Sequence, residues 1–190
     1  MAYDNKIRII GGLFKGRKLE VIDMDGLRPT TDRVRETVFN WIGERTSGAA
    51  VLDLFAGSGA LGLEALSRGA KSLTLVEKDA DTAAILKSNI STLPDAAGEA
   101  RVVNQDALSF LENLESKPAF DLIFLDPPFS SDLLEPAVEL IVQKELLNDG
   151  GVVYIEMNKA KKKVLFGLTM IRDGEAGQCH YGLYERSFFI

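Results

Sequence analysis

A glycine-rich loop follows one short apolar run and precedes a helical pattern. The run Val51–Phe55 leads into Gly57, Gly59 and Gly62, which have the GxGxxG spacing of a nucleotide-binding turn. Glu77 ends the next β-rich run, at the distance where an acidic side chain meets a ribose diol. The pattern predicts a site for a nucleoside-type cofactor. The alternative is a turn whose glycines serve only close packing of strand and helix.

Two further acidic residues bear on the kind of cofactor. Asp53 stands four residues before Gly57, where it would repel a pyrophosphate but attract the ammonium and sulfonium groups of S-adenosylmethionine. Asp106 follows the third β-rich run, with Ala107 next to it, and can accept a hydrogen bond from an adenine amino group. By position alone, Asp106 is equally suited to cap a helix. Acids at three successive strand ends favour S-adenosylmethionine over NAD, and no metal is expected.

The segment that ends the fourth β-rich run carries the candidate chemistry. There Asp126, Pro127, Pro128 and Phe129 follow a wholly apolar stretch, at the edge where open α/β sheets bind ligands. Two prolines fix the backbone and remove two donors, so the loop offers only acceptors to a substrate such as an exocyclic amine. Phe129 offers a face on which a flipped base can stack. The alternative is a plain turn with Phe129 in the core.

These motifs can form one site only if a sheet brings the strand ends together. The chain has the pattern of such a sheet, because β-rich runs alternate with helical patterns along it. Five β-rich runs are expected to be strands, namely Ala50–Phe55, Leu73–Glu77, Arg101–Asn104, Leu122–Leu125 and Val152–Glu156. The helical patterns between them are Ala60–Arg68, Ala80–Ser91, Ala107–Leu114 and Asp132–Lys144. This alternation predicts an α/β fold with a mostly parallel, doubly wound sheet covered by helices on both faces.

The end of the chain departs from the alternation. Leu165–Ile171 and Tyr181–Phe189 are strand-like, and no helical pattern lies in Arg172–His180 between them. We therefore expect an antiparallel pair at one edge of the sheet.

Two short β-like pieces, Arg8–Gly12 and Arg17–Val21, precede the sheet and predict an N-terminal hairpin. A helix should follow, capped by Thr31 or Asp32. Trp41 lies on the apolar face of this helix and is expected in the core.

Charge is distributed unevenly along the 190 residues. The net charge is −6, yet residues 1–35 hold eight basic and five acidic residues. Five cations without an acid between them form a basic stripe on the expected hairpin, Lys6, Arg8, Lys15, Arg17 and Lys18. A basic stripe on an acidic body indicates a directed contact with a polyanion. The run Lys159–Lys163 is interpreted as a solvated face, with RNA contact as the alternative.

The amino-acid composition indicates the general class of protein. With 46% hydrophobic and 26% charged residues the chain is expected to be one globular domain over residues 1–190, with 1–27 as a basic appendage. The single Cys179 cannot form an intrachain disulfide, and His180, the single histidine, excludes a His-based metal cluster or triad. No apolar run reaches about 18 residues, and Met1–Ile10 lacks the apolar region of a secretory signal, so a cytoplasmic protein is expected.

The acid–glycine loop and the Asp126–Phe129 motif resemble those of S-adenosylmethionine-dependent amino methyltransferases of nucleic acids. Over nearly the whole chain the resemblance extends to the RsmD family of bacterial 16S ribosomal RNA guanine-N2 methyltransferases. Its N-terminal motifs are similar to Arg8–Gly12, Lys15–Arg17 and Arg28–Glu36.

The resemblance implies a Rossmann-like class I methyltransferase fold whose seven-stranded sheet has an antiparallel pair at one edge. It implies that Thr31 and Arg33 help to hold the methionine end of the cofactor. It further implies a monomer that methylates the 2-amino group of one guanine in 16S ribosomal RNA, within the small subunit or its precursor.

Two other functions remain open at this point. A DNA adenine or cytosine amino methyltransferase shares the Asp126–Phe129 motif, although 190 residues leave little room for a separate target-recognition domain. A non-catalytic or NAD-binding Rossmann module would share the glycine loop but would leave Asp126–Phe129 unexplained.

Overall fold

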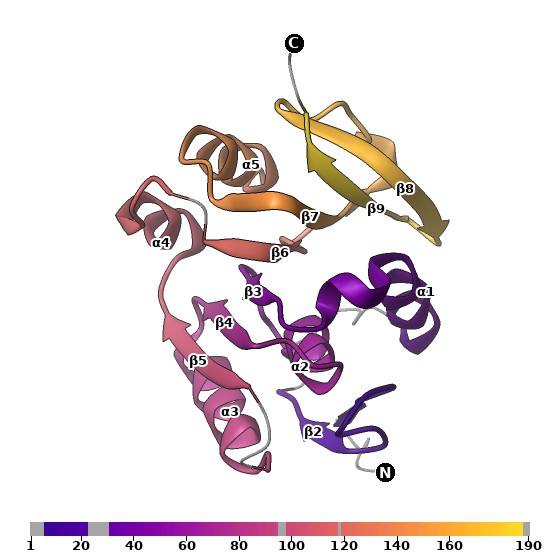
Figure 1. Ribbon diagram of the computed structural model, residues 1–190, viewed down its shortest axis with the longest axis vertical. Helices are drawn as coiled ribbons and strands as arrows, with labels where there is room; N and C mark the ends of the chain where they lie inside the picture. Colours follow the sequence, from indigo (N-terminus) through magenta and orange to yellow (C-terminus); the bar gives the residue numbers. More distant parts are fainter. Residues whose placement is uncertain (1–5, 23–30, 95–97, 118, 188–190) are drawn as a thin grey trace.

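The computed structural model describes residues 6–22, 31–94, 98–117 and 119–187. Its centre is a twisted seven-stranded sheet (Figure 1). The strands are β3 (Ala50–Asp53), β4 (Ser72–Glu77), β5 (Glu99–Asn104), β6 (Phe120–Leu125), β7 (Leu147–Asn158), β8 (Leu168–Ala176) and β9 (Cys179–Arg186). Their order is β5-β4-β3-β6-β7-β9-β8, and the first five are mutually parallel. The order reverses between β3 and β6, which is where ligands bind in open sheets of this kind.

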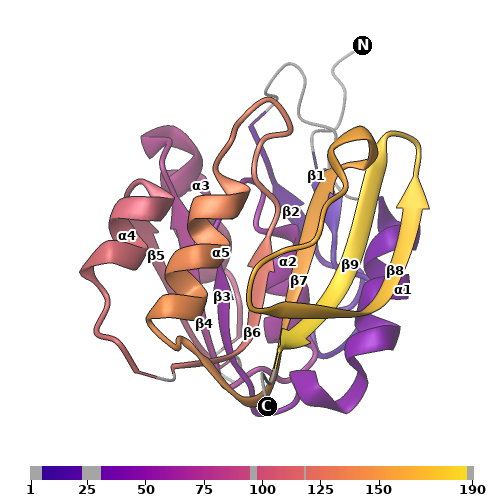
Figure 2. The same cartoon turned by 90° about the horizontal axis from the view of Figure 1, so that it is seen from above.

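Helices cover both faces of the sheet, as the alternating pattern predicted (Figure 2). They are α1 (Asp32–Ile42), α2 (Ala60–Ser67), α3 (Ala80–Ser91), α4 (Ala107–Asn113) and α5 (Leu134–Gln143). Buried side chains of α1, α2 and α3 belong to one apolar cluster and those of α4 and α5 to another. The sheet therefore separates two cores, and each helix stabilises it by burying one apolar face.

The C-terminal strands confirm the expected antiparallel edge, but both reach further toward the turn between them than predicted, and β8 begins at Leu168 instead of Leu165. β9 lies between β7 and β8 and is antiparallel to both. Ala176 pairs with Cys179 across a two-residue turn in which Gly177 has a φ of 60°, so both strands run into the segment interpreted as a connection. The expected strand end at 188–189 lies outside the described residues.

β7 also begins earlier than predicted, at Leu147 instead of Val152. Its pairing with β6 shifts register between Phe120 and Leu122, where β7 contributes extra residues. Gly150, with a φ of 76°, lies in this bulge. The bulge accommodates these additional residues within the strand.

The N-terminal hairpin consists of β1 (Lys6–Arg8) and β2 (Lys18–Glu20), which pair antiparallel. The two strands are Lys6–Arg8 and Lys18–Glu20 instead of the predicted Arg8–Gly12 and Arg17–Val21. The first does not continue to Gly12 because the amides of Ile10 and Gly11 both donate to the buried carboxylate of Glu64, at 2.8 Å each. These amides are thereby withdrawn from strand pairing. Residues 1–5 and 23–27 of the expected appendage lie outside the described residues.

The helix after the hairpin begins as predicted. Thr31 is the N-cap of α1, and its Oγ1 accepts from the amide of Val34 at 3.4 Å. Trp41 packs half-buried against the core, with its ring stacked 5.5 Å from that of Tyr181. Among the described residues, no helix has the length and apolar character needed to cross a membrane.

Candidate active site

Carboxylates gather at the carboxyl ends of four neighbouring parallel strands. Glu77 ends β4, Asp53 ends β3, Asp126 follows β6, and Glu156 lies near the end of β7. Strand register sets them near one level, since Asp53 pairs with Phe124 and Leu125 pairs with Ile155. The sheet therefore collects four acids from segments that extend along the chain from Asp53 to Glu156.

The glycine loop is held between two of these acids. The Gly57 amide donates to Glu77 Oε2 at 2.8 Å, and the Gly62 amide donates to Asp53 Oδ2 at 3.0 Å. Gly57 has a φ of 51° and open space where a Cβ would stand, whereas a Cβ on Gly59 would lie 2.6 Å from Leu86 of α3. Gly57 thus leaves room for a ligand, while Gly59 is required by packing as well as by its φ of 75°.

Burial and mutual repulsion disturb the ionisation of two of the acids. Burial, with a further contribution from the charges of Glu77 and Glu156, raises the pKa of Asp53 to about 7. Burial, followed by the charges of Glu156 and Asp53, raises the pKa of Asp126 well above its ordinary value. A site that concentrates negative charge in this way is suited to a cationic ligand.

Glu156 was missed by the sequence analysis, although it marks the end of an expected strand. Tyr154 donates to its Oε1 at 2.8 Å and the Cys179 thiol to its Oε2 at 3.3 Å. Burial and the Glu156 charge raise the pKa of the Cys179 thiol, which agrees with its interpretation as an unreactive residue. An acid at the carboxyl end of the fifth parallel run is the signal that would have identified Glu156.

Asp106 lies at the end of the neighbouring strand, and the structure shows it capping a helix. Its Oδ1 accepts from the amide of Ser109 at 3.1 Å, and Ala107 is the buried first residue of α4. Asn104 ties this end of β5 to the end of β4, because its side-chain amide donates to the carbonyl oxygens of Glu77 and Lys78, both at 2.9 Å. Asp106 therefore sits beside the glycine-loop acids while serving as an N-cap.

The loop after β6 borders a cavity of about 110 Å³. Pro127 is buried and Pro128 exposed, while Phe129 shows 38% of its surface. Phe129 is thus not a core residue, contrary to the plain-turn alternative. The cavity is lined by residues of the loop, the start of α5 and the end of β7, including Glu156.

A larger hollow, of about 300 Å³, lies at the opposite edge of the sheet, where it is lined by Ala49 before β3 and Asp121 early in β6. The cavity beside Phe129 is the candidate site because ligands of open parallel sheets bind at the carboxyl ends of the strands.

Residues of the N-terminal motif lie on α1. Arg33 is exposed, and Thr31 caps the helix with its hydroxyl. Asp32 is held by two arginines, at 2.6 Å from Arg35 Nη2 and 3.3 Å from Arg8 Nη2. Residues 28–30 of the motif lie outside the described residues.

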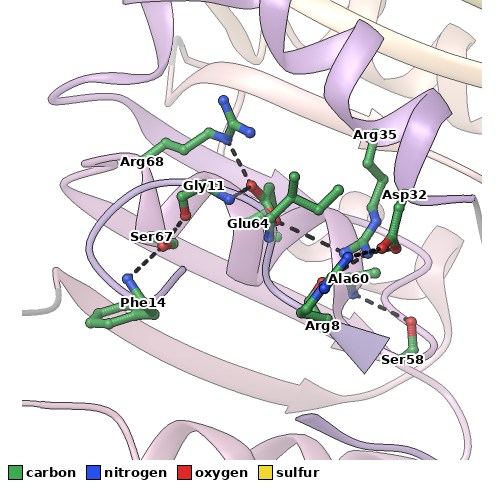
Figure 3. A network of polar contacts seen from close by, with 12 residues as sticks. Arg8, Gly11, Phe14, Asp32, Arg35, Ser58, Ala60, Glu64, Ser67 and Arg68 are labelled. Carbon is green, nitrogen blue, oxygen red and sulfur yellow. Dashed lines mark hydrogen bonds and ion pairs between the residues drawn. The ribbon is translucent and has the colours of Figure 1, made fainter. Parts of the chain in front are cut away.

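A buried polar network fastens the hairpin loop to α2 (Figure 3). Glu64 is fully buried, accepts from Ile10 and Gly11, pairs with Arg68 at 2.8 Å, and has Arg35 Nη1 at 3.9 Å. Ser67 donates to the Gly11 carbonyl at 2.6 Å. Since α2 begins directly after the glycine loop, the same short helix positions both the loop and the hairpin.

The basic stripe is mostly exposed on this hairpin. Lys6, Lys15 and Lys18 are exposed and Arg17 is half-exposed, whereas Arg8 is engaged with Asp32. The sequence placed these cations together, and the structure gives them one support, the hairpin packed on α2.

The two remaining candidates have structural partners. His180 is fully buried with its Nε2 3.0 Å from Asp173 Oδ2, consistent with a role outside the site. The lysine run begins in the short 3-10 helix η2 (Lys159–Lys161), where Lys161 is 3.7 Å from Asp132 and Lys162 is 2.9 Å from Asp173.

Comparison with known proteins identifies the family of the chain. A family model described as Conserved hypothetical protein 95 matches residues 7–185. A protein of Escherichia coli named ribosomal RNA small subunit methyltransferase D is 47% identical over 95% of this chain and 90% of its own length. Its namesake from Haemophilus influenzae is 43% identical over 95% and 94%. The solved structure of Escherichia coli yhhF is 46% identical and superimposes with a TM-score of 0.84, covering 95% of this chain and 98% of that one. The chain therefore belongs to the RsmD family of ribosomal RNA methyltransferases, as its motifs predicted.

Proposed function

We propose that this protein is a cytoplasmic methyltransferase that uses S-adenosylmethionine to methylate the exocyclic 2-amino group of a guanine in 16S ribosomal RNA. The observation that carries the proposal is the loop after β6, in which Phe129 lines a cavity and Asp126 lies close enough to Glu156 and Asp53 for their charges to raise its pKa. Relatives over almost the full length are named ribosomal RNA small subunit methyltransferases, which supports the class of substrate.

The carboxylates of the site fit the charge and the hydroxyl groups of S-adenosylmethionine. Burial raises the pKa of both Asp53 and Asp126, and the charge of Glu156 adds to the shift of each, so a positive charge among these acids would relieve the repulsion. Glu77 already accepts from the Gly57 amide and can accept from ribose hydroxyls at the same loop. Asp106 and Ala107 would border the adenine, and Thr31 and Arg33 the methionine end. When bound, S-adenosylmethionine supplies a methyl group on a sulfonium that is already a good leaving group.

The chain's residues would act on the substrate by positioning it. Asp126 and the Pro127 carbonyl can each accept one N–H of the amine, which directs the nitrogen lone pair toward the methyl group. Phe129 presents a partly exposed ring for stacking the flipped base. As the nitrogen–carbon bond forms and the sulfur–carbon bond breaks, the amine loses one proton, for which Asp126 is the nearest acceptor in the loop.

RNA contact at the hairpin is part of the proposal. The acidic remainder of the protein repels phosphate, whereas the exposed cations of the stripe form a positively charged surface to which RNA phosphates can bind. Replacing Lys15 and Arg17 by Ala spares the Arg8–Asp32 pair, and should weaken RNA binding while leaving cofactor affinity unchanged. Filter binding against salt measures this loss.

Methylation assays test the proposal directly. Incubation with labelled S-adenosylmethionine and separate pools of 16S ribosomal RNA, small subunits and duplex DNA should label only the ribosomal substrates. Digestion and mass spectrometry should then identify N2-methylguanosine. Labelled DNA, methyladenosine, or tight NADH binding in place of S-adenosylmethionine binding would each overturn it.

A further inference from the structure

The lysines that follow β7 do not all point to the same place. Lys161 and Lys163 line the cavity beside Phe129. Lys162, between them, instead pairs with Asp173 of β8. The start of this segment is fixed because Asn158 Oδ1 accepts from the Ala160 amide at 2.9 Å. Two of these lysines therefore belong to the candidate site, and one does not.

Two carboxylates, one just before α5 and one in its first turn, pair with the two cavity lysines. Lys161 Nζ lies 3.7 Å from Asp132 Oδ1, and Lys163 pairs with Glu135 Oε1. The acids line the same cavity, so both ion pairs cross its mouth. All four side chains are largely exposed, and exposed pairs of this kind are weak and screened by salt. A competing anion can replace the carboxylates at small cost.

The charge around the cavity makes the lysines necessary for an RNA ligand. Among the described residues that line it, they are the only cations, and they share the cavity with the acids Glu156, Asp132 and Glu135. A base that stacks on Phe129 brings its own phosphates to the rim, where these acids would repel them. Lys161 and Lys163 stand where that repulsion can be offset.

We propose that Lys161 and Lys163 bind the phosphates that flank the target nucleotide, and that these phosphates take the place of Asp132 and Glu135 when RNA occupies the cavity mouth. The inference rests on the proposed function and extends it with a second phosphate-binding surface, separate from the N-terminal hairpin. Asp132 and Glu135 keep the lysine side chains at the rim in the free protein.

The first test compares RNA binding by two double variants. One variant removes the two lysines that line the cavity, and the other removes two lysines of the same run that lie outside it. The variant Lys161→Ala/Lys163→Ala should bind a 16S ribosomal RNA transcript with a log–log salt slope reduced by about 1.5, from about 0.7–0.9 per lost phosphate contact. The matched control Lys159→Ala/Lys162→Ala removes the same charge from residues outside the cavity lining. A slope reduced equally in both variants would overturn the inference.

The second test uses the carboxylates. Asp132→Asn/Glu135→Gln frees the lysines, and should strengthen RNA binding several-fold at low salt. Adding Lys161→Ala/Lys163→Ala should abolish this gain, whereas adding the control pair should not. A gain that survives loss of the cavity lysines would contradict the exchange.

Binding of S-adenosylmethionine, followed by calorimetry, should be unchanged in every variant, and thermal unfolding verifies that each folds. Failure of the wild-type protein to methylate RNA would count against the proposed function. Normal methylation by the wild type, with no difference between the cavity and control variants, would count only against the role of these lysines.

Discussion

The residues with the strongest chemical signature are carboxylates that the fold forces together. Asp53 is 2% exposed and accepts one amide hydrogen bond, yet burial and the charges of Glu77 and Glu156 raise its pKa to about 7. Charge held in this unfavourable way weakens the free protein but strengthens the attraction for a cation. The two consequences predict opposite responses to pH.

Cofactor affinity should rise with pH. As pH increases from 6 to 8, Asp53 ionises, and its carboxylate should strengthen binding of S-adenosylmethionine by up to about tenfold. Asp53→Asn keeps an oxygen for the Gly62 amide and should remove most of this rise. Calorimetry at several pH values measures both profiles. Superimposable profiles would show that Asp53 does not meet the cofactor's charge.

Asp126 and Phe129 should affect the reaction more than cofactor binding. Asp126→Ala removes an acceptor for the amine and should slow single-turnover methylation by about 10- to 100-fold, the range for losing a hydrogen bond to a charged group. Phe129→Ala should also slow it, whereas Phe129→Tyr retains the stacking face and most of the rate. A normal rate in Asp126→Ala would exclude the orienting role.

At the scale of elements, α2 connects the two halves of the site. Its first turn follows the glycine loop, and Glu64 and Ser67 in its later turns bind the backbone of the hairpin loop (Figure 3). Arg35 of α1 completes the network by donating to the Arg8 carbonyl at 2.9 Å. Hairpin, α1 and glycine loop are thereby fixed to one another by buried polar groups, which are costly to leave unpaired.

Glu64 should therefore be a major source of stability. Glu64→Ala leaves two amides and Arg68 Nε without their acceptor and removes a carboxylate 3.9 Å from the buried Arg35 guanidinium, so it should lower the free energy of unfolding by about 3–5 kcal/mol. Glu64→Gln retains an acceptor and should cost less. Urea denaturation measures both, with the exposed Glu115→Ala as a control that changes little. Equal stabilities of Glu64→Ala and Glu115→Ala would refute the anchoring role.

At the scale of the whole molecule, sheet order decides what the site contains. Placing β3 and β6 side by side joins the glycine loop to the Asp126–Phe129 loop, and placing β7 next to β6 adds Glu156 and the lysine segment. Because the same assembly buries these acids close together, their repulsion lowers the free energy of unfolding of the protein.

The repulsion between these buried carboxylates predicts how the free energy of unfolding depends on pH. The folded chain retains protons on Asp53 and Asp126 that the unfolded chain releases above about pH 4, so the free energy of unfolding should fall as pH rises from about 4 to 7. Asp53→Asn should flatten this fall and stabilise the protein by up to about 4 kcal/mol above pH 7. Asp173→Asn is the control of opposite sign, because hydrogen bonds from Lys162 and His180 lower the pKa of Asp173. Urea titrations at pH 5 and pH 8 measure the difference, and a stability that increases over this range would contradict it.

Local sequence determined the elements and most of the candidate site. Alternating β-rich and helical patterns predicted the parallel sheet, and the positions of Gly57, Glu77 and Asp126 after or at the ends of β-rich runs placed these residues at strand ends. Both follow from short-range properties: apolar periodicity, the backbone freedom of glycine and the rigidity of proline.

Tertiary structure alone decided what depends on contacts between distant segments. Withdrawal of the Ile10 and Gly11 amides to Glu64 shortened a predicted strand, and strand pairing extended β8 and β9 to their turn. The cavity position of Lys161 and Lys163, and the mutual repulsion of Asp53, Asp126 and Glu156, arise only when non-consecutive strands become neighbours. Charge interactions and hydrogen bonds depend on distances in space, and those distances are set by the assembled sheet.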